Sequence, residues 1–129
     1  MGRFLAAVLI AGLILTGTGC NGGDFIILVR IGEANNGGVI DVPQGSEVLV
    51  VLSGNPTTGY QWELAQHDES RLTFVGSWYA PGSGGIGGGG EYQFRFTTTL
   101  SGEAPLRLIY RQPWSPEAAQ TFAVTIIIS

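Results

Sequence analysis

The sequence predicts an all-β sandwich of about seven or eight short strands, with three loops gathered at one end, and three observations support this fold. No stretch after residue 20 shows the 3.6-residue hydrophobic period of an amphipathic helix. Several stretches instead alternate apolar and polar residues with a period of two, which is typical of half-buried strands. Clusters of Gly, Pro, Asn and Ser separate these stretches, as expected for the turns of an all-β domain.

Residues 1–20 are expected to form a signal peptide. Arg3 supplies a positive start, and the apolar run from Phe4 to Leu15 is too short to span a bilayer comfortably. The run leads to TGTGC, which resembles the lipobox of bacterial lipoproteins, although Gly17 stands where a large aliphatic residue is usual. We therefore expect Cys20 to be lipidated as the mature N-terminus, and a plain secretory peptide is the alternative.

A lipid on Cys20 would be the protein's attachment to a membrane. It would place the protein in the cell envelope, on the periplasmic or cell-surface side of a bacterial membrane, and without the lipid the protein would be secreted. Cys20 is also the single cysteine of the chain, so no internal disulfide can form. The fold must therefore be stabilised by its apolar core.

The mature chain is expected to begin with a tether and to continue as one domain. Residues 21–37 would form the tether and the first strand, and residues 38–129 would form the sandwich domain. In chain order, the expected strands span residues 25–31 with 37–42 as a continuation, 47–52, 60–64, 71–78, 91–96, 105–111 and 121–128.

The clearest strand pattern is EYQFRFTTTL at residues 91–100. Alternation predicts one inward face, made of Tyr92, Phe94, Phe96, Thr98 and Leu100. The stretch TFAVTIII at residues 121–128 repeats this pattern. In YQWEL at residues 60–64, the same alternation places Tyr60 and Trp62 inward. By contrast, EVLVVL at residues 47–52 is apolar on both faces, as expected for a strand that is covered on both sides.

Three connections have an unusual composition: GNPTTG at residues 54–59, PGSGGIGGGG at residues 81–90 and QPWSPEA at residues 112–118. If each connection joins neighbouring antiparallel strands, the connections alternate between the two ends of the sandwich. The connections after the second, fourth and sixth strands then share one end, as binding loops do in antibody variable domains. These are the three unusual connections, so the sequence predicts that they cluster.

Each of these loops offers a different means of binding. Asn55 and Pro56 fix a turn that would hold Thr57 and Thr58 at its tip with little loss of entropy on binding. The glycines of the second loop would let the backbone of a partner approach closely. Trp114, flanked by prolines, offers a large apolar anchor. A structural role explains each feature equally well by itself, but together at one end they favour a binding partner.

The composition argues against an enzyme, a metal site and a nucleic-acid partner. Five arginines, ten carboxylates and no lysine give residues 21–129 a net charge of −5, which favours neither nucleic acid nor an anionic membrane surface. His67 is the single histidine, so neither a histidine-dependent triad nor a histidine-rich metal cluster can be built. No pair of carboxylates is marked out by its setting, and no cofactor or metal is expected.

The loop sequences resemble those of a known family. NPTTGYQW, a glycine-rich loop running into YQFRF, and YRQPW are together similar to the chagasin-type inhibitors of papain-family cysteine peptidases. The resemblance covers roughly residues 40–128, and the residues from Asn55 to Tyr60 and Trp62 match the most distinctive motif. One position departs from it: the family usually has arginine directly before the proline, whereas this chain has Gln112, with Arg111 one place earlier and therefore on the opposite face of the strand.

The resemblance implies an immunoglobulin-like sandwich that inhibits papain-like cysteine peptidases reversibly and without a covalent bond. In the family the three loops form a wedge in the active-site cleft, with the NPTTG loop in the centre beside the catalytic cysteine. The glycine-rich loop lies along the non-primed side of the cleft, and the tryptophan-bearing loop packs on the primed side. A monomer without cofactors is implied. The peptidase-binding residues implied are Asn55, Pro56, Thr57, Thr58, Gly59, Gly84, Gly85, Gly87, Gly88, Gly89, Gly90, Arg111, Pro113 and Trp114.

A second hypothesis uses the same loops for another purpose. A surface-anchored β-sandwich lipoprotein could bind glycan or another protein through them, since Trp114 suits either partner. Inhibition of papain would discriminate between the two hypotheses.

Overall fold

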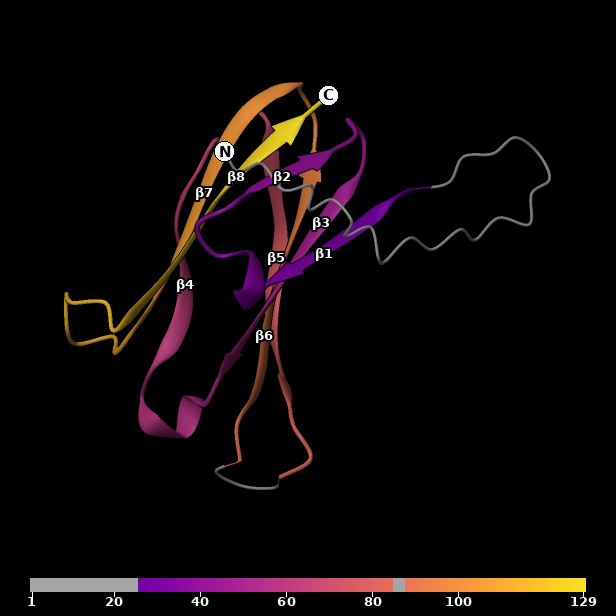
Figure 1. Cartoon of the computed structure of the whole chain (residues 1–129). Helices are drawn as coiled ribbons and strands as arrows, with labels where there is room; N and C mark the ends of the chain where they lie inside the picture. Colours follow the sequence, from indigo (N-terminus) through magenta and orange to yellow (C-terminus); the bar gives the residue numbers. More distant parts are fainter. Residues whose placement is uncertain (1–25, 85–87) are drawn as a thin grey trace.

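Two four-stranded β-sheets face each other in the computed structural model of the chain, which describes residues 26–84 and 88–129 (Figure 1). The first sheet has the strand order β1-β3-β6-β5 and the second has the order β2-β8-β7-β4. The elements are β1 (Leu28–Gly32), the 3₁₀ turn η2 (Glu33–Asn35), β2 (Val39–Val42), β3 (Glu47–Gly54), the 3₁₀ turn η3 (Pro56–Thr58), β4 (Gln61–His67), β5 (Leu72–Pro81), β6 (Gly90–Thr98), β7 (Gly102–Arg111) and β8 (Gln120–Ile128). The predicted all-β sandwich is confirmed. None of the described residues forms a helix long and apolar enough to cross a membrane.

The alternation of the sequence explains the core between the sheets. The predicted inward residues Phe94, Phe96 and Thr98 of β6 are all buried, as are the inward residues of β8. Every residue from Val48 to Leu52 in β3 is buried, as the two-sided apolar pattern predicted. Leu100 is the exception, with 52% of its surface exposed, because β6 ends at Thr98 and the chain turns there.

The first strand differs from the prediction. We expected residues 37–42 to continue the strand at 25–31, but β1 pairs in parallel with β3 in one sheet, whereas β2 pairs in parallel with β8 in the other. The side chain of Asn36 fixes the crossover. Its Oδ1 accepts a hydrogen bond from the Ala123 N–H at 2.8 Å, and its Nδ2 donates to the Thr121 carbonyl at 3.1 Å. The amide side chain thus adds to the backbone bond from the Gly37 N–H to the Ala123 carbonyl, at 2.7 Å, at the start of the second sheet.

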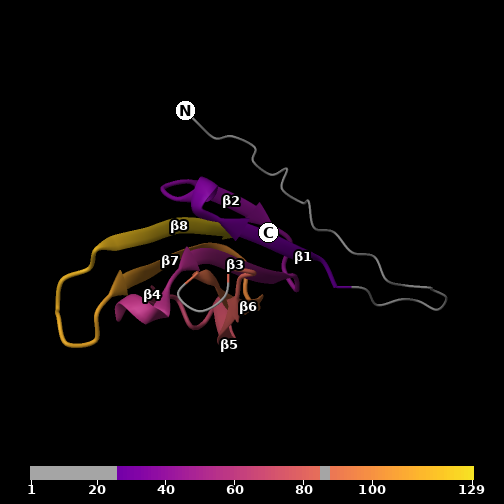
Figure 2. The same ribbon diagram turned by 90° about the horizontal axis from the view of Figure 1, so that it is seen from below.

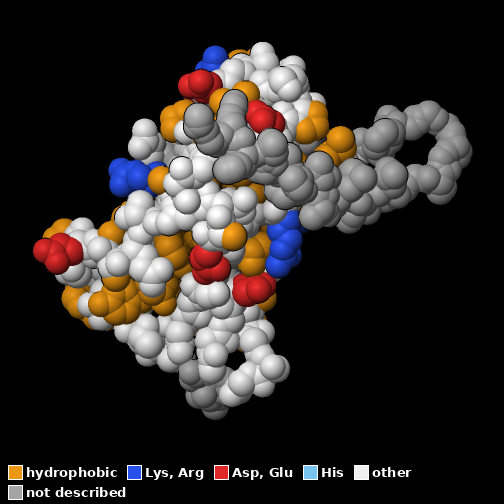
Figure 3. Space-filling model, viewed as in Figure 1, with side chains coloured by type: hydrophobic (Ala, Val, Ile, Leu, Met, Phe, Trp, Pro, Cys, Tyr) orange, Lys and Arg blue, Asp and Glu red, His pale blue; other side chains and the backbone are white. Residues whose placement is uncertain are grey.

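The three unusual connections lie at one end of the sandwich, as predicted. In the first sheet, Gly90 at the start of β6 pairs with both Gly54 and Pro81, so the β3–β4 and β5–β6 connections leave from the same end. In the second sheet, Arg111 at the end of β7 pairs with Gln61 at the start of β4. Figure 1 shows these connections on the side away from the C-terminus, and Figure 2 views the molecule from this lower side. In the space-filling view, the lower end of the molecule carries no charged side chain on the visible face (Figure 3).

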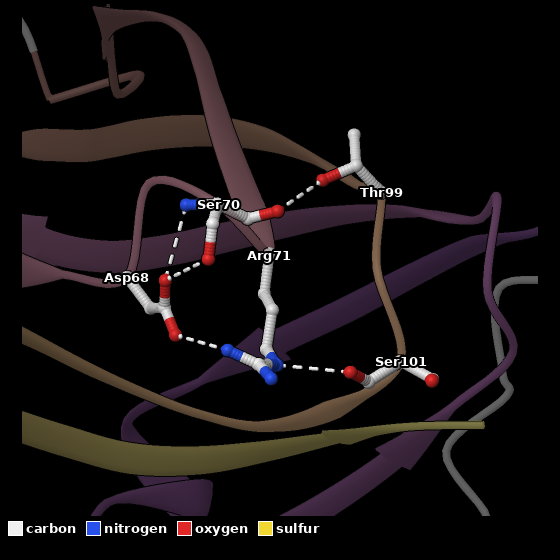
Figure 4. Close-up of polar contacts among 5 residues, drawn as sticks. All are labelled: Asp68, Ser70, Arg71, Thr99 and Ser101. Carbon is white, nitrogen blue, oxygen red and sulfur yellow. Dashed lines mark hydrogen bonds and ion pairs between the residues drawn. The ribbon is translucent and has the colours of Figure 1, made fainter.

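The opposite end is tied together by a small polar network around Asp68 and Arg71 (Figure 4). Asp68 Oδ1 accepts hydrogen bonds from the Ser70 N–H at 3.0 Å and the Ser70 hydroxyl at 2.6 Å. Its Oδ2 pairs with Arg71 Nη1 at 2.9 Å, and Arg71 Nε donates to the Ser101 carbonyl at 2.9 Å. The β4–β5 and β6–β7 turns are therefore joined through the Arg71 guanidinium group and through the Thr99 hydroxyl, which donates to the Ser70 carbonyl at 2.8 Å.

We expect this network to make the stability of the domain depend on pH. The hydrogen bonds from Ser70 and then those from Arg71 hold the pKa of Asp68 below its ordinary value of 3.8. A carboxyl whose pKa is lowered by folding stabilises the native state above its unfolded pKa, and this contribution is lost as the pH falls through the folded pKa. We predict that Asp68→Asn, which keeps an acceptor for Ser70 but loses the ion pair, lowers the free energy of unfolding at pH 7.

Denaturant unfolding of the wild type and of Asp68→Asn at several pH values measures this effect. The difference between the two proteins should narrow as the pH falls below 3.8. Glu69→Gln removes the neighbouring exposed carboxylate and serves as the matched control, which should stay close to the wild type. A difference between the wild type and Asp68→Asn that stays constant down to pH 2 would contradict the prediction.

Candidate functional site

The first loop (residues 55–60) is a stiff turn built by its own side chains. Asn55 caps the η3 turn, and its Oδ1 accepts hydrogen bonds from the Thr57 N–H at 3.1 Å and the Thr57 hydroxyl at 2.7 Å. Pro56 supplies the restricted φ of the first turn residue. The turn ends at Gly59, whose φ of +88° lies in the left-handed region that favours glycine. Each residue of the NPTTG motif therefore has a local reason for its identity.

The threonine hydroxyls of the first loop are engaged within the loop itself. Thr58 Oγ1 donates to the Asn55 carbonyl at 2.7 Å, just as Thr57 donates to the Asn55 side chain. Both threonines are exposed. A partner can therefore meet these hydroxyls as acceptors on a fixed tip, and the loop loses little conformational entropy on binding.

Aromatic side chains support the first loop from below. Tyr110 on β7 stacks on Tyr60, with ring centroids 5.4 Å apart, and lies 5.1 Å from Trp62. The Tyr110 hydroxyl oxygen accepts a hydrogen bond from the Asn55 N–H at 3.0 Å, and Trp62 Nε1 donates to the Ser53 carbonyl at 3.0 Å. Tyr60 and Trp62 thus act as a base for the loop, in agreement with their predicted inward positions.

Tyr92 adds to this base from the first sheet. Burial, followed by the nearby Tyr110 and Tyr79, raises its pKa above the ordinary value of 10.0. Its hydroxyl therefore stays protonated and can donate to the Tyr60 carbonyl, 3.5 Å away. Tyr92 therefore contributes a neutral hydroxyl group to the base of the first loop throughout the physiological pH range.

The described parts of the second loop (residues 82–89), namely residues 82–84 and 88–89, run close together and consist mostly of glycine. The Gly82 N–H donates to the Gly89 carbonyl at 2.8 Å, which continues the pairing of β5 with β6. A Cβ atom built on Gly88 would lie 2.8 Å from the backbone of Gly84, so neither arm of this loop has room for a side chain there. Of the predicted site residues, Gly85 and Gly87 lie outside the described part of the chain, whereas Gly84, Gly88, Gly89 and Gly90 lie within it.

The third loop (residues 112–119) carries the most exposed tryptophan. Trp114 exposes 72% of its surface, and Pro113 is exposed beside it. The Ser115 N–H donates to the Gln112 carbonyl at 2.9 Å, which closes a tight turn around these two residues. Arg111 does not extend into solvent: its Nε lies 3.2 Å from Glu63 Oε2, and its Nη1 donates to the Ser115 carbonyl at 2.7 Å.

The first loop contacts both of its neighbours. A Cβ atom built on Gly59 would lie 2.9 Å from Cη2 of Trp114, so the indole ring rests where a side chain at position 59 would stand. On the other side, a Cβ atom on Gly89 would lie 3.2 Å from the Gly54 carbonyl oxygen and 3.7 Å from the Cβ atom of Asn55. The three loops therefore form one continuous surface with the NPTTG turn in the middle.

This surface has no charged groups at its centre. Neither residues 54–60 nor residues 82–90 contain a charged side chain. Among the described residues, no group of three or more His, Cys, Asp or Glu side chains could hold a metal ion. In Figure 3 the described atoms at the bottom of the molecule are free of red and blue, whereas the third loop, on the left, carries an acidic side chain. The arrangement suits recognition by shape and by backbone hydrogen bonds.

Two residues of the site were not predicted as such. The strand pattern at residues 105–111 implies an inward Tyr110, so alternation could have placed it under the loops. The alternation that places Trp62 inward puts Glu63 on the outward face, and its pairing with Arg111 there depends on the register between β4 and β7, which the sequence does not contain. Cys20, the predicted lipidation site, lies outside the described residues.

Comparison with known proteins agrees with the geometry of the site. The model of the chagasin family of peptidase inhibitors (I42) matches residues 41–126. Amoebiasin-1 of Entamoeba histolytica is 36% identical over 97 residues, which cover 73% of this chain and 93% of that protein. Chagasin of Trypanosoma cruzi is 28% identical over 104 residues, which cover 77% of this chain and 94% of that protein.

A solved structure agrees with the fold. The crystal structure of a cysteine protease inhibitor from Entamoeba histolytica superposes with a TM-score of 0.70 at 14% identity, covering 79% of this chain and 95% of that one. At this identity the likeness concerns the fold alone. Together with the family match over residues 41–126, these comparisons identify an inhibitor and not an enzyme. The chain therefore belongs to the chagasin family of peptidase inhibitors.

Proposed function

We propose that this protein inhibits papain-like cysteine peptidases by inserting its three loops into the active-site cleft, reversibly and without a covalent bond. The observation that carries the proposal is the capped NPTTG turn at the centre of a continuous three-loop surface. The turn matches the most distinctive motif of the chagasin-type inhibitors. It contains no electrophile that could react with a thiol, so binding would be non-covalent.

The contacts among the loops support a wedge that is formed before binding. The first loop is held by Asn55 and by Tyr110, and it touches the second loop through Gly89 and the third through Trp114. A surface that is already ordered pays less conformational entropy on association. With a buried area of about 1,600 Å², typical of protease–inhibitor complexes, this preorganisation would determine the affinity more than the area would.

The η3 turn also supports an inhibitor and not a substrate. The backbone from Pro56 to Thr58 is in a 3₁₀ turn that is closed by the Gly59 N–H donating to the Pro56 carbonyl at 3.0 Å. A peptidase cleft binds its substrates as extended peptides. This turn is folded, so it would enter the cleft without taking the conformation of a substrate. In such a complex Thr57 and Thr58 would lie nearest the catalytic cysteine, Gly84 to Gly90 along the non-primed side, and Trp114 on the primed side.

The exposed face of Trp114 favours a second candidate function. With 72% of its surface in solvent, this indole could stack on a sugar ring or on another surface protein. A glycan-binding protein of this kind would bind polysaccharide and leave cysteine peptidases fully active.

A titration of papain, and of a cathepsin L-like peptidase, tests the main proposal. We expect purified residues 22–129 to abolish hydrolysis of a fluorogenic substrate in a stoichiometric manner, and dilution to restore it. Full peptidase activity at micromolar protein, with a β-sheet circular dichroism spectrum, would overturn the proposal. Binding to a polysaccharide array under the same conditions would then favour the second candidate.

A substitution at the centre of the wedge tests the placement of the loops. We predict that Thr58→Arg raises the inhibition constant for papain at least about 30-fold, because a long charged side chain would replace a small one at the most tightly packed point of the interface. Thr73→Arg introduces the same side chain at an exposed position of β5, away from the loops, and should inhibit like the wild type. Equal inhibition by both variants would place the contact surface elsewhere.

We also propose that the protein is attached to the cell envelope through a lipid on Cys20, with its loops facing away from the membrane. The direction of β1 supports this orientation. Because β1 runs parallel to β3, and Leu28 pairs with Glu47 at the start of β3, the described chain begins at the end opposite the loops. The six links between Cys20 and Ile26 can span at most about 22 Å.

Detergent phase partitioning of the full chain, expressed in a bacterium, tests the anchor. We predict that the wild-type protein enters the detergent phase and incorporates labelled palmitate, whereas Cys20→Ser stays in the aqueous phase and remains unlabelled. Partitioning of both proteins into the aqueous phase, without label, would contradict lipidation and leave secretion as the route.

A further inference from the structure

The third loop is fastened to the second sheet by the Arg111 side chain. Arg111 is the last residue of β7, and Glu63 lies on the adjacent strand β4, where it is the diagonal neighbour of Arg111, since Arg111 itself pairs with Gln61 and Glu63 pairs with Ile109. The guanidinium group lies between two partners, with Nε 3.2 Å from Glu63 Oε2 and Nη1 donating to the Ser115 carbonyl at 2.7 Å. It therefore connects strand β4 to the far side of the loop turn.

The position of Trp114 depends on Ser115, one of the two residues that the Arg111 side chain contacts. Trp114 directly precedes Ser115, whose carbonyl is held by Arg111 and whose N–H is held by the Gln112 carbonyl at 2.9 Å. With the backbone fixed on both sides of Ser115, the indole reaches Gly59, where its Cη2 atom occupies the space beside the first loop. Release of the Ser115 carbonyl would free the turn that carries Trp114.

We propose that Arg111 is a positioning residue, which fixes the Trp114 loop against the first loop and does not bind the peptidase directly. This inference rests on the proposed inhibitory function and changes one assignment implied by the family resemblance, in which Arg111 was among the peptidase-binding residues. The arginine side chain is only 27% exposed, and it is engaged by the ion pair with Glu63 and by the hydrogen bond to the Ser115 carbonyl.

The shift of the arginine by one place explains this change of role. On a strand, neighbouring residues face opposite sides, so Arg111 extends along the outer face of the second sheet toward Glu63. The Gln112 side chain lies instead near the first loop, with its Nε2 atom 3.7 Å from a Cβ atom built on Gly59. Arg111 thus lies on the outer face of the second sheet, and the uncharged Gln112 lies at the loop surface.

The geometry requires arginine and not only a positive charge. The guanidinium group reaches two partners at once, with Nε in an ion pair with a carboxylate and Nη1 donating to a carbonyl, whereas a lysine ammonium group is a single point of charge. Lysine at position 111 could keep either the ion pair with Glu63 or the bond to Ser115.

Inhibition constants for papain test the inference with four variants of the full mature domain. We expect Arg111→Gln to raise the inhibition constant about tenfold, because it breaks a partly exposed ion pair and also releases an ordered loop. We expect Glu63→Ala to raise the inhibition constant about threefold, because it breaks the ion pair alone. The double variant should equal Arg111→Gln alone, because both changes release the same loop. Arg107→Gln removes a charge from the same strand outside the loops and is the matched control, with an expected change of less than twofold.

A direct contact between Arg111 and the peptidase predicts a different pattern. Glu63→Ala would then leave the inhibition constant unchanged or lower it, because it frees the guanidinium group, while Arg111→Gln would still raise it. That result would overturn the inference. Arg111→Lys should fall between the wild type and Arg111→Gln if one of the two bonds is kept.

A second measurement on the free protein does not depend on inhibition. With 5-fluorotryptophan incorporated, the fluorine resonance of Trp114 can be assigned by its loss in Trp114→Phe. We expect this resonance to shift or broaden in Arg111→Gln and Glu63→Ala and to stay in place in Arg107→Gln. An unmoved resonance in Arg111→Gln would refute the positioning role. A moved resonance in a protein that does not inhibit papain would support that role and count against the proposed function alone.

Discussion

The hydrogen bond from the Asn55 N–H to the Tyr110 hydroxyl oxygen joins the loop surface to the sandwich beneath it. Asn55 follows the last residue of β3 in the first sheet, whereas Tyr110 belongs to β7 in the second, so this bond also links the two sheets at their loop end. Tyr110 packs on Tyr60 and Trp62 as well, and it carries the start of the third loop. The shape of the first and third loops therefore depends on one half-buried ring.

Most of the fold could be predicted because alternation depends only on which residues are apolar. The inward faces of β6 and β8 followed from their period of two, and the parity of the connections placed three loops at one end. The division of the first strand between two sheets could not be predicted in this way. It depends on Asn36, a polar residue in a turn, whose amide happens to meet the backbone of β8. Such a contact joins positions that are 85 and 87 residues apart in the sequence.

The candidate site, like the fold, has one part that could be predicted from the sequence and another that could not. The NPTTG turn could be predicted, because a capping asparagine, a proline and a left-handed glycine act within a few residues of one another. The approach of Trp114 to Gly59 and the pairing of Arg111 with Glu63 join separate elements, and their geometry depends on the register between β4 and β7. The sequence placed Arg111 on the correct face of its strand. The partner on that face is a property of the tertiary structure.

The absence of charge from the first two loops affects how the protein would meet a partner. Electrostatic steering raises association rates when the contacting surfaces carry complementary charge, and salt weakens it. A neutral tip on a domain that is acidic elsewhere gains little from steering, so its association rate would change little between dilute and saline surroundings. Discrimination among targets would then come from the shape of the cleft. A protein of this kind could act on peptidases whose surfaces differ widely in charge.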